Sequence, residues 1–173
     1  PWDNLEELVE DARKRPDEIV WGAMAGATSH FMLAMLEQEA GVDFKMVDAG
    51  SESEKITMLL GGHLDVINIR MKNMGVMGVE RDFAFPDYST TAEQGHNVVW
   101  NGEFMLWGPA GMPDEMVAQI NEVLEGYGTT DQKSADAIAG HGGWVVERTA
   151  DESIAFMYET YKEFEALAKE LGF

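Results

Sequence analysis

The chain of 173 residues is long enough for one domain or a domain and a half, and its hydrophobic content of 45% excludes an intrinsically disordered protein. With 32 acidic and 12 basic residues the formal net charge is −20, which argues against nucleic acid and anionic membranes as partners because both require clusters of Lys and Arg. Cysteine is absent, which excludes disulfides and thiol chemistry, and no apolar run approaches the roughly 18 residues of a membrane span, so direct membrane insertion is not expected.

The strong negative charge suits a protein kept soluble in salty surroundings, where screening over about 8 Å or less reduces self-repulsion. A halophilic or marine source is therefore a hypothesis. The sequence starts at Pro1 without a Met or a signal-type apolar segment, so we expect a processed or truncated chain.

The first predicted element is an amphipathic helix that stops before Pro16. Asp3-Asn-Leu-Glu6 resembles a capping box with Asp in place of Ser or Thr, so we expect the helix to start there. Its apolar face consists of Leu5, Leu8, Val9 and Ala12.

The stretch from Ile19 to Ala40 organises the rest of the chain. It predicts a short β-branched strand, a loop of small residues and a helix. Such a turn leaves the first helical N–H groups without intrahelical partners and places the positive end of the helix dipole, roughly half a charge, at the loop. This arrangement can bind an anion. The candidate ligand-binding residues here are Gly26, Ala27, Thr28, Ser29 and His30.

The small residues of this loop also have a simpler explanation than an anion site. Any strand-to-helix turn needs small residues and a cap, so a plain N-cap by Thr28 or Ser29 explains the pattern about equally well. The phosphate-binding patterns G-x-x-x-x-G-K-[ST] and G-x-G-x-x-G are absent, so a nucleotide phosphate is not expected.

A second strand, small-residue turn and helix follow the first. Gly41 is placed to end the helix, and Phe44–Val47 predicts a second strand. Gly50 and Ser51 form a second small-residue turn, in which Ser51-x-x-Glu54 is a capping box for another helix.

A third strand, Val66–Ile69, follows after Gly61-Gly62. Strands that alternate with helices predict a parallel α/β sheet with right-handed crossovers, and ligands bind such sheets at the carboxyl ends of the strands. Both small-residue turns fall at that edge, which favours the anion site over a plain cap. Asp65, just before the third strand, is expected either to cap a loop or to hold the binding turn.

The remaining segments predict strands and capped helices. Further strands are expected at Met74–Val79, Val98–Trp107 and Trp144–Val146. Helices are expected to open at Thr90-x-x-Glu93, at Pro113, around Ser134–Ala139 and at Thr149-x-x-Glu152.

The sequence contains no motif typical of a catalytic site or a metal-binding site. Ser29 and His30 are adjacent at a helix start and point in different directions, and no G-x-S-x-G elbow occurs. The four histidines, which fall in four segments without a metal-binding pair, are His30, His63, His96 and His141. No catalytic residue, metal or cofactor is therefore expected. Two alternatives stay open: a small α/β enzyme acting on an acidic metabolite with His30 and Asp65 as acid and base, and a ligand-sensing module.

Five segments, in order along almost the whole chain, resemble the TctC family: GAMAGATSH, DAGS, LLGGHLDV, ERDFAFPDYSTTAEQG and WGPAGMPDEMV. These proteins, also called Bug receptors, are the extracytoplasmic solute receptors of tripartite tricarboxylate transporters. The resemblance implies a type II periplasmic-binding-protein fold of two α/β lobes with a small carboxylate solute in the cleft between them. It also implies a periplasmic or extracytoplasmic location and delivery to membrane permease subunits without chemistry.

The family's ligand turns can be carried over residue by residue. Its helix start falls on Thr28, Ser29 and His30 after Gly26 and Ala27, its G-S turn on Gly50 and Ser51, and its G-G-x-x-D on Gly61, Gly62 and Asp65.

The chain departs from the family in three places. The loop before Thr28 is one residue shorter, and the family's first lobe would precede Pro1. A helical segment that the family carries between the positions of Arg70 and Met71 is absent, so either the protein is shortened there or, as we expect, residues are missing. The resemblance implies that residues 1–97 form mostly the second, ligand-binding lobe, and that residues 98–173 supply an inter-lobe strand and C-terminal helices. The identity of the carboxylate is not fixed by the sequence.

Overall fold

The computed structural model describes residues 1–69, 74–82, 85–100, 102–125, 130–140, 143–170 and 172. The chain divides into two compact units, one formed by Pro1–Asn101 with Leu167–Phe173 and the other by Gly102–Ala166. All of the described β-strands lie in the first unit. The division into a ligand-binding lobe at 1–97 and completing elements at 98–173 stays a prediction.

The first unit is built on a parallel sheet with the strand order β2-β1-β3. Its strands are β1 (Val20–Ala23), β2 (Lys45–Asp48) and β3 (Val66–Ile67). In the central strand, Gly22 pairs with Val47 on one side and with Ile67 on the other. The parallel α/β arrangement that the alternating strands and helices predict is therefore confirmed for this unit.

Three helices connect or precede these strands: α1 (Leu5–Lys14), α2 (Thr28–Ala40) and α3 (Glu52–Leu60). As predicted, α1 stops before Pro16, and α2 ends at Gly41, whose φ of 62° lies in the left-handed region that favours glycine. The capping box predicted between Ser51 and Glu54 is also formed.

The predicted cap of α1 is wrong by one residue. The N-cap is Asn4, whose side chain accepts a hydrogen bond from the N–H of Glu7 at 2.9 Å. The carboxylate of Glu7 in turn accepts from the N–H of Asp3 at 2.9 Å. This pairing resembles a capping box, but the acidic partner is Glu7 rather than Glu6, and Glu7 binds the N–H of Asp3 rather than that of the N-cap residue Asn4.

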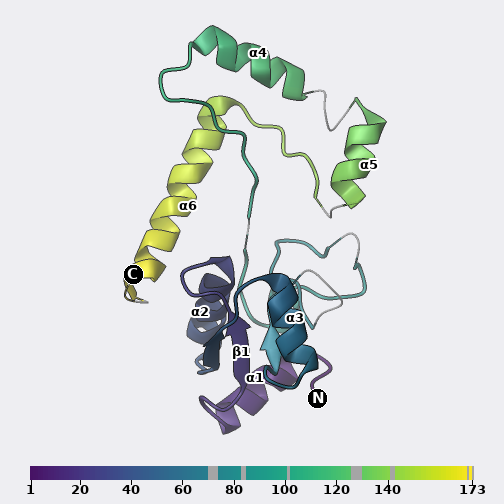
Figure 1. Ribbon diagram of the computed structural model, residues 1–173, viewed down its shortest axis with the longest axis vertical. Coiled ribbons are helices and arrows are strands. Elements are labelled where there is room, and N and C mark those ends of the chain that lie inside the picture. The colour runs from purple at the N-terminus through teal and green to yellow at the C-terminus, as the bar shows by residue number, and fades with distance from the viewer. Residues whose placement is uncertain are drawn as a thin grey trace. The chain divides into compact units, whose positions relative to one another are not determined.

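The main core of the first unit lies between one face of the sheet and helices α1 and α2. Trp21 and Phe44 meet there edge to face, with ring centroids 5.0 Å apart. Figure 1 shows β1 between α2 and α3, in agreement with a doubly wound sheet. The buried residues of this core are Leu5, Leu8, Val9, Ala12, Ile19, Trp21, Ala23, Leu33, Leu36, Ala40, Val42, Phe44, Val66 and Val98.

After β3 the chain contains little regular structure before the second unit. The strand predicted at Met74–Val79 is reduced to a single parallel bridge between Val76 and Thr90. The predicted cap at Thr90 and Glu93 forms and opens a 3-10 turn at Ala92–Gln94. The expected missing segment between residues 70 and 71 lies outside the described residues.

The second unit contains α4 (Asp114–Glu125), α5 (Gln132–Gly140) and most of α6 (Ala150–Glu170). The predicted cap of α6 forms between Thr149 and Glu152, whose carboxylate accepts from the Thr149 N–H at 2.8 Å. None of the described helices is long and apolar enough to cross a membrane.

The strands predicted at Val98–Trp107 and Trp144–Val146 are wrong for the residues that the structure describes, none of which pairs as a strand. A strand requires a neighbour for its N–H and C=O groups, and apolar alternation alone does not supply one. Three aromatic side chains of these segments, Phe104, Trp107 and Trp144, are each more than half accessible to solvent.

Candidate functional site

The turn between β1 and α2 is a tight reversal at the carboxyl end of the central strand. The N–H of Ala27 donates to the carbonyl of Met24 at 3.0 Å, and Gly26 between them has a φ of 72°. A residue with a side chain is strained in that conformation, so glycine is required at the turn. Met24, Ala25 and Gly26 are all exposed, so the turn lies at the surface of the unit.

Helix α2 begins at this turn without a side-chain cap. Its N-cap is Ala27, which has no side-chain oxygen to offer, so the explanation by a plain cap at Thr28 or Ser29 is wrong. The hydroxyl of Ser29 instead accepts a hydrogen bond from the N–H of Met24 at 2.9 Å. Thr28 is exposed, and its hydroxyl makes no hydrogen bond with any described residue. The first amides of α2 therefore have no side-chain cap, and the Thr28 hydroxyl is a further donor beside them.

Two further side chains fix the turn. The Nδ1 atom of His30 accepts from the N–H of Gly26 at 3.2 Å, which requires that this nitrogen carry no proton. Asp48, the last residue of β2, accepts from the N–H of Ala25 at 3.1 Å. Sequence reasoning missed Asp48, although its pairing with Ala23 follows from the parallel register. Because the Asp48 carboxylate already accepts from the Ala25 N–H, the donors that remain for an anion are those at the start of α2.

The second small-residue turn lies beside the first. The N–H of Ala49 donates to the carbonyl of Ala23 at 2.9 Å, which joins the ends of β2 and β1. The N–H and hydroxyl of Ser51 both donate to Glu54 Oε2, at 2.7 and 2.8 Å, and these two bonds, the backbone one first, lower the pKa of Glu54. The Ser51 donors therefore serve the cap of α3. A Cβ on Gly50 would lie 2.5 Å from the same carboxylate oxygen.

Asp65 lies at the other end of the sheet. It precedes β3, its side chain accepts from the N–H of Val20 at 2.9 Å, and its own N–H donates to the Val20 carbonyl at 2.9 Å. Val20 is the first residue of β1, so about 10 Å of strand separates Asp65 from the turn that leads to His30. The expectation that Asp65 adjoins the binding turn is therefore wrong, and His30 and Asp65 do not form an acid–base pair.

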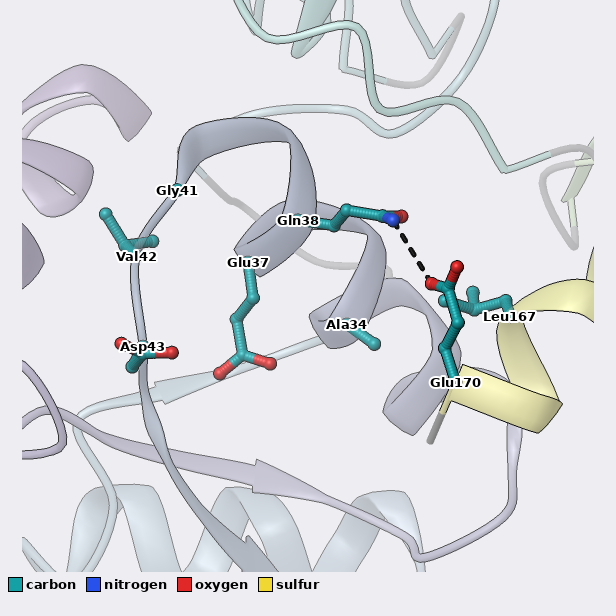
Figure 2. A pocket seen from close by; sticks show the side chains of 8 residues that line it. All are labelled: Ala34, Glu37, Gln38, Gly41, Val42, Asp43, Leu167 and Glu170. Carbon is teal, nitrogen blue, oxygen red and sulfur yellow. Dashed lines mark hydrogen bonds between the residues drawn. The ribbon is translucent and has the colours of Figure 1, made fainter. Parts of the chain in front are cut away.

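A separate hollow of about 360 Å³ lies at the opposite end of α2 (Figure 2). Its lining includes the carboxylates of Glu37, Asp43 and Glu170, and Gln38 Nε2 donates to Glu170 Oε2 at 3.1 Å. Burial raises the pKa of Glu37, against a backbone hydrogen bond from Phe44 that lowers it. A helix C-terminus and several carboxylates repel an anion, so this hollow is unsuited to a carboxylate solute.

The described residues contain no group of three or more His, Asp or Glu side chains placed to hold a metal ion. The side chains of the α2 turn are committed to holding backbone amides in place. The donors left over at the start of α2 are therefore backbone N–H groups and the Thr28 hydroxyl, a set that is suited to an anion.

Comparisons with known proteins agree with these features. A family model described as "Tripartite tricarboxylate transporter family receptor", TctC, matches residues 1–173. A UPF0065 protein of Cupriavidus necator is 22% identical over 184 residues, which cover 99% of this chain and 56% of that protein.

Solved structures show the same fold. Rhodopseudomonas palustris Rpa4515 with adipate matches with a TM-score of 0.81 at 18% identity, over 98% of this chain and 61% of that one. A TctC solute-binding protein from Polaromonas matches with a TM-score of 0.75 at 23% identity, over 98% of this chain and 62% of that one. MatC from R. palustris with bound malate matches with a TM-score of 0.67 at 18% identity, over 92% of this chain and 60% of that one. The chain thus spans about three fifths of the length of its relatives.

Proposed function

Because the chain belongs to the TctC family of tripartite tricarboxylate transporter receptors, we propose that it captures a small dicarboxylate at the start of α2. The family consists of solute receptors and not of enzymes. The solute would be held between this unit and a second lobe in the periplasm, and then passed to the membrane permease subunits.

The single observation that carries this proposal is the uncapped start of α2. The N–H groups of Thr28 and Ser29 have no partner within the helix, and the Thr28 hydroxyl adds a third donor at the same place. A carboxylate there replaces the missing cap and meets the positive end of the helix dipole. Gly50, on the adjoining turn, is the second proposed contact, whereas Ser51 is assigned to the cap of α3.

Two relatives support a dicarboxylate as the proposed class of solute. One related structure contains adipate and another contains malate, and both solutes are dicarboxylates. The net charge of −20 repels such dianions at long range, so binding must depend on donors in direct contact and should strengthen when salt screens the remaining surface.

A thermal-unfolding assay at high salt tests the proposal. Adipate and malate are added separately, and the uncharged diamide of adipate is the control. A dicarboxylate at a hundred times its dissociation constant should stabilise the protein by about 2.7 kcal/mol, whereas the diamide should have no effect. Equal effects of adipate and its diamide, or no effect of any dicarboxylate, would contradict carboxylate capture.

A further inference from the structure

Lys55 is a charged residue in an unexpected place. It lies in the second turn of α3 and is only 6% exposed, although a lysine is almost never fully buried unless it is paired. Its side chain makes no hydrogen bond and no ion pair with any residue that the structure describes. Burying an ammonium group without a partner costs free energy that a bound anion would offset.

Helix α3 begins at the same edge of the sheet as the proposed site. Because the chain passes from β1 through α2 to β2, and then back across β1 through α3 to β3, right-handed crossovers place α2 and α3 on opposite faces of the sheet (Figure 1). Both helices follow strand ends, at Ala23 and Asp48, so both begin at the same carboxyl edge.

Lys55 comes four residues after the cap of α3, and its backbone N–H donates to the carbonyl of Ser51 at 3.0 Å. Side chains on a helix lean toward the N-terminus of that helix. With that lean, a side chain as long as that of Lys55 can reach from α3 toward the edge where β1 and β2 end.

We propose that Lys55 is the counter-ion of a solute carboxylate bound at this edge, facing the amides at the start of α2. This inference rests on the proposed function and adds a charged specificity residue to it. Dianionic solutes gain most from such a site, because one carboxylate can bind the α2 amides while the other meets the ammonium.

The test compares Lys55→Met with Lys45→Met by calorimetric titration with adipate and malate. Lys45 is an exposed lysine at the amino end of β2, so its variant changes the net charge equally without touching the site. We expect Lys55→Met to bind either dicarboxylate at least tenfold more weakly, and Lys45→Met to stay within twofold of the original protein. Lys55→Met should also unfold at a higher temperature, because a buried unpaired charge is replaced by an apolar side chain of similar length.

Lys55→Arg and Lys55→Gln complete the series. Arginine should retain most of the affinity and glutamine should not, and circular dichroism confirms that each variant is folded. If the original protein binds dicarboxylates and folded Lys55→Gln or Lys55→Met binds them within twofold, the role of Lys55 is overturned while the proposed function stands. If the original protein binds no dicarboxylate, both are overturned.

Discussion

The hydroxyl of Ser29 accepts a hydrogen bond from the backbone N–H of Met24 at 2.9 Å, so the second residue of α2 holds the turn that precedes the helix. Ser29 is buried and Thr28 beside it is exposed. The Ser29 hydroxyl therefore stabilises the turn, whereas the Thr28 hydroxyl is the one that we propose contacts a solute.

Ser29→Ala should lower the free energy of unfolding by about 1–3 kcal/mol, because it leaves the Met24 N–H without its partner. Thr28→Ala should change stability by less than about 0.5 kcal/mol, yet weaken dicarboxylate binding by about 1–3 kcal/mol. Urea unfolding and calorimetric titration of both variants measure these effects. Unchanged affinity in Thr28→Ala would remove its hydroxyl from the site.

The Glu37 carboxyl should make stability depend on pH. Burial raises its pKa in the folded state above the ordinary value of 4.5, so its contribution to stability is fully present below that value and is lost as the pH rises through the folded pKa. Glu37→Gln should therefore be more stable than the original protein at pH 7, and the difference should vanish below pH 4.5.

Glu159→Gln, at an exposed position of α6, is the matched control, because it relieves the same unit of negative charge without burial. The two variants are compared by thermal unfolding across the pH range. Equal gains at pH 7 would show that Glu37 acts only through the net charge.

The cap of α3 should be structural. Ser51→Ala should cost about 0.5–2 kcal/mol of stability at neutral pH and leave dicarboxylate affinity within twofold, because both Ser51 donors already bind Glu54. The lowered pKa of Glu54 means that this stabilisation is present above the ordinary value of 4.5 and is lost as the pH falls through the folded pKa. A large loss of affinity in Ser51→Ala would return its hydroxyl to the binding site.

Gly41 should tolerate no side chain. Its φ of 62° costs an alanine about 1–2 kcal/mol, so Gly41→Ala should lower stability by that amount in chemical denaturation. Gly140, the last residue of α5, has open space around its Cβ position and no left-handed φ. Gly140→Ala should therefore be neutral or slightly stabilising, and an equal loss in both variants would contradict the conformational argument.

Salt should stabilise the chain. Raising the ionic strength from 0.1 M to 1 M shortens the screening length from about 10 Å to about 3 Å, which weakens repulsion among the 32 acidic residues. The midpoint of thermal unfolding should rise accordingly with sodium chloride. A midpoint that is insensitive to salt would count against adaptation to a saline habitat.

Local sequence patterns correctly predicted those features that depend only on residues close together in the chain. The cap at Ser51 and Glu54 and the helix end at Gly41 depend on a few adjacent residues, and both are confirmed. The strand at Val98–Trp107 depends on a partner strand far along the chain, which periodicity cannot supply. The position of Asp65 could have been predicted, because a residue before a parallel strand lies at the amino edge of the sheet.

The charged residues were harder to predict. Lys55 stands among acidic and polar residues of α3, a pattern typical of an exposed helix face, and its burial becomes visible only in the structure. The predicted second strand ends at Val47, which leaves Asp48 in the following turn, and the bond from the Ala25 N–H to Asp48 depends on how the two turns meet in three dimensions. The sequence thus identified the turns and the local caps, whereas the long-range partner of the Ala25 N–H became visible only in the structure.

The most direct test of the central claim is the amide NMR spectrum of the protein during titration with adipate. The start of α2 should respond first, with the largest shifts at the N–H groups of Thr28 and Ser29 and smaller ones at Gly50. Amides around Glu37 and Asp43, in the acidic hollow at the other end of the helix, should not move. Shifts confined to that hollow, with Thr28 and Ser29 unchanged, would contradict carboxylate binding at the start of α2.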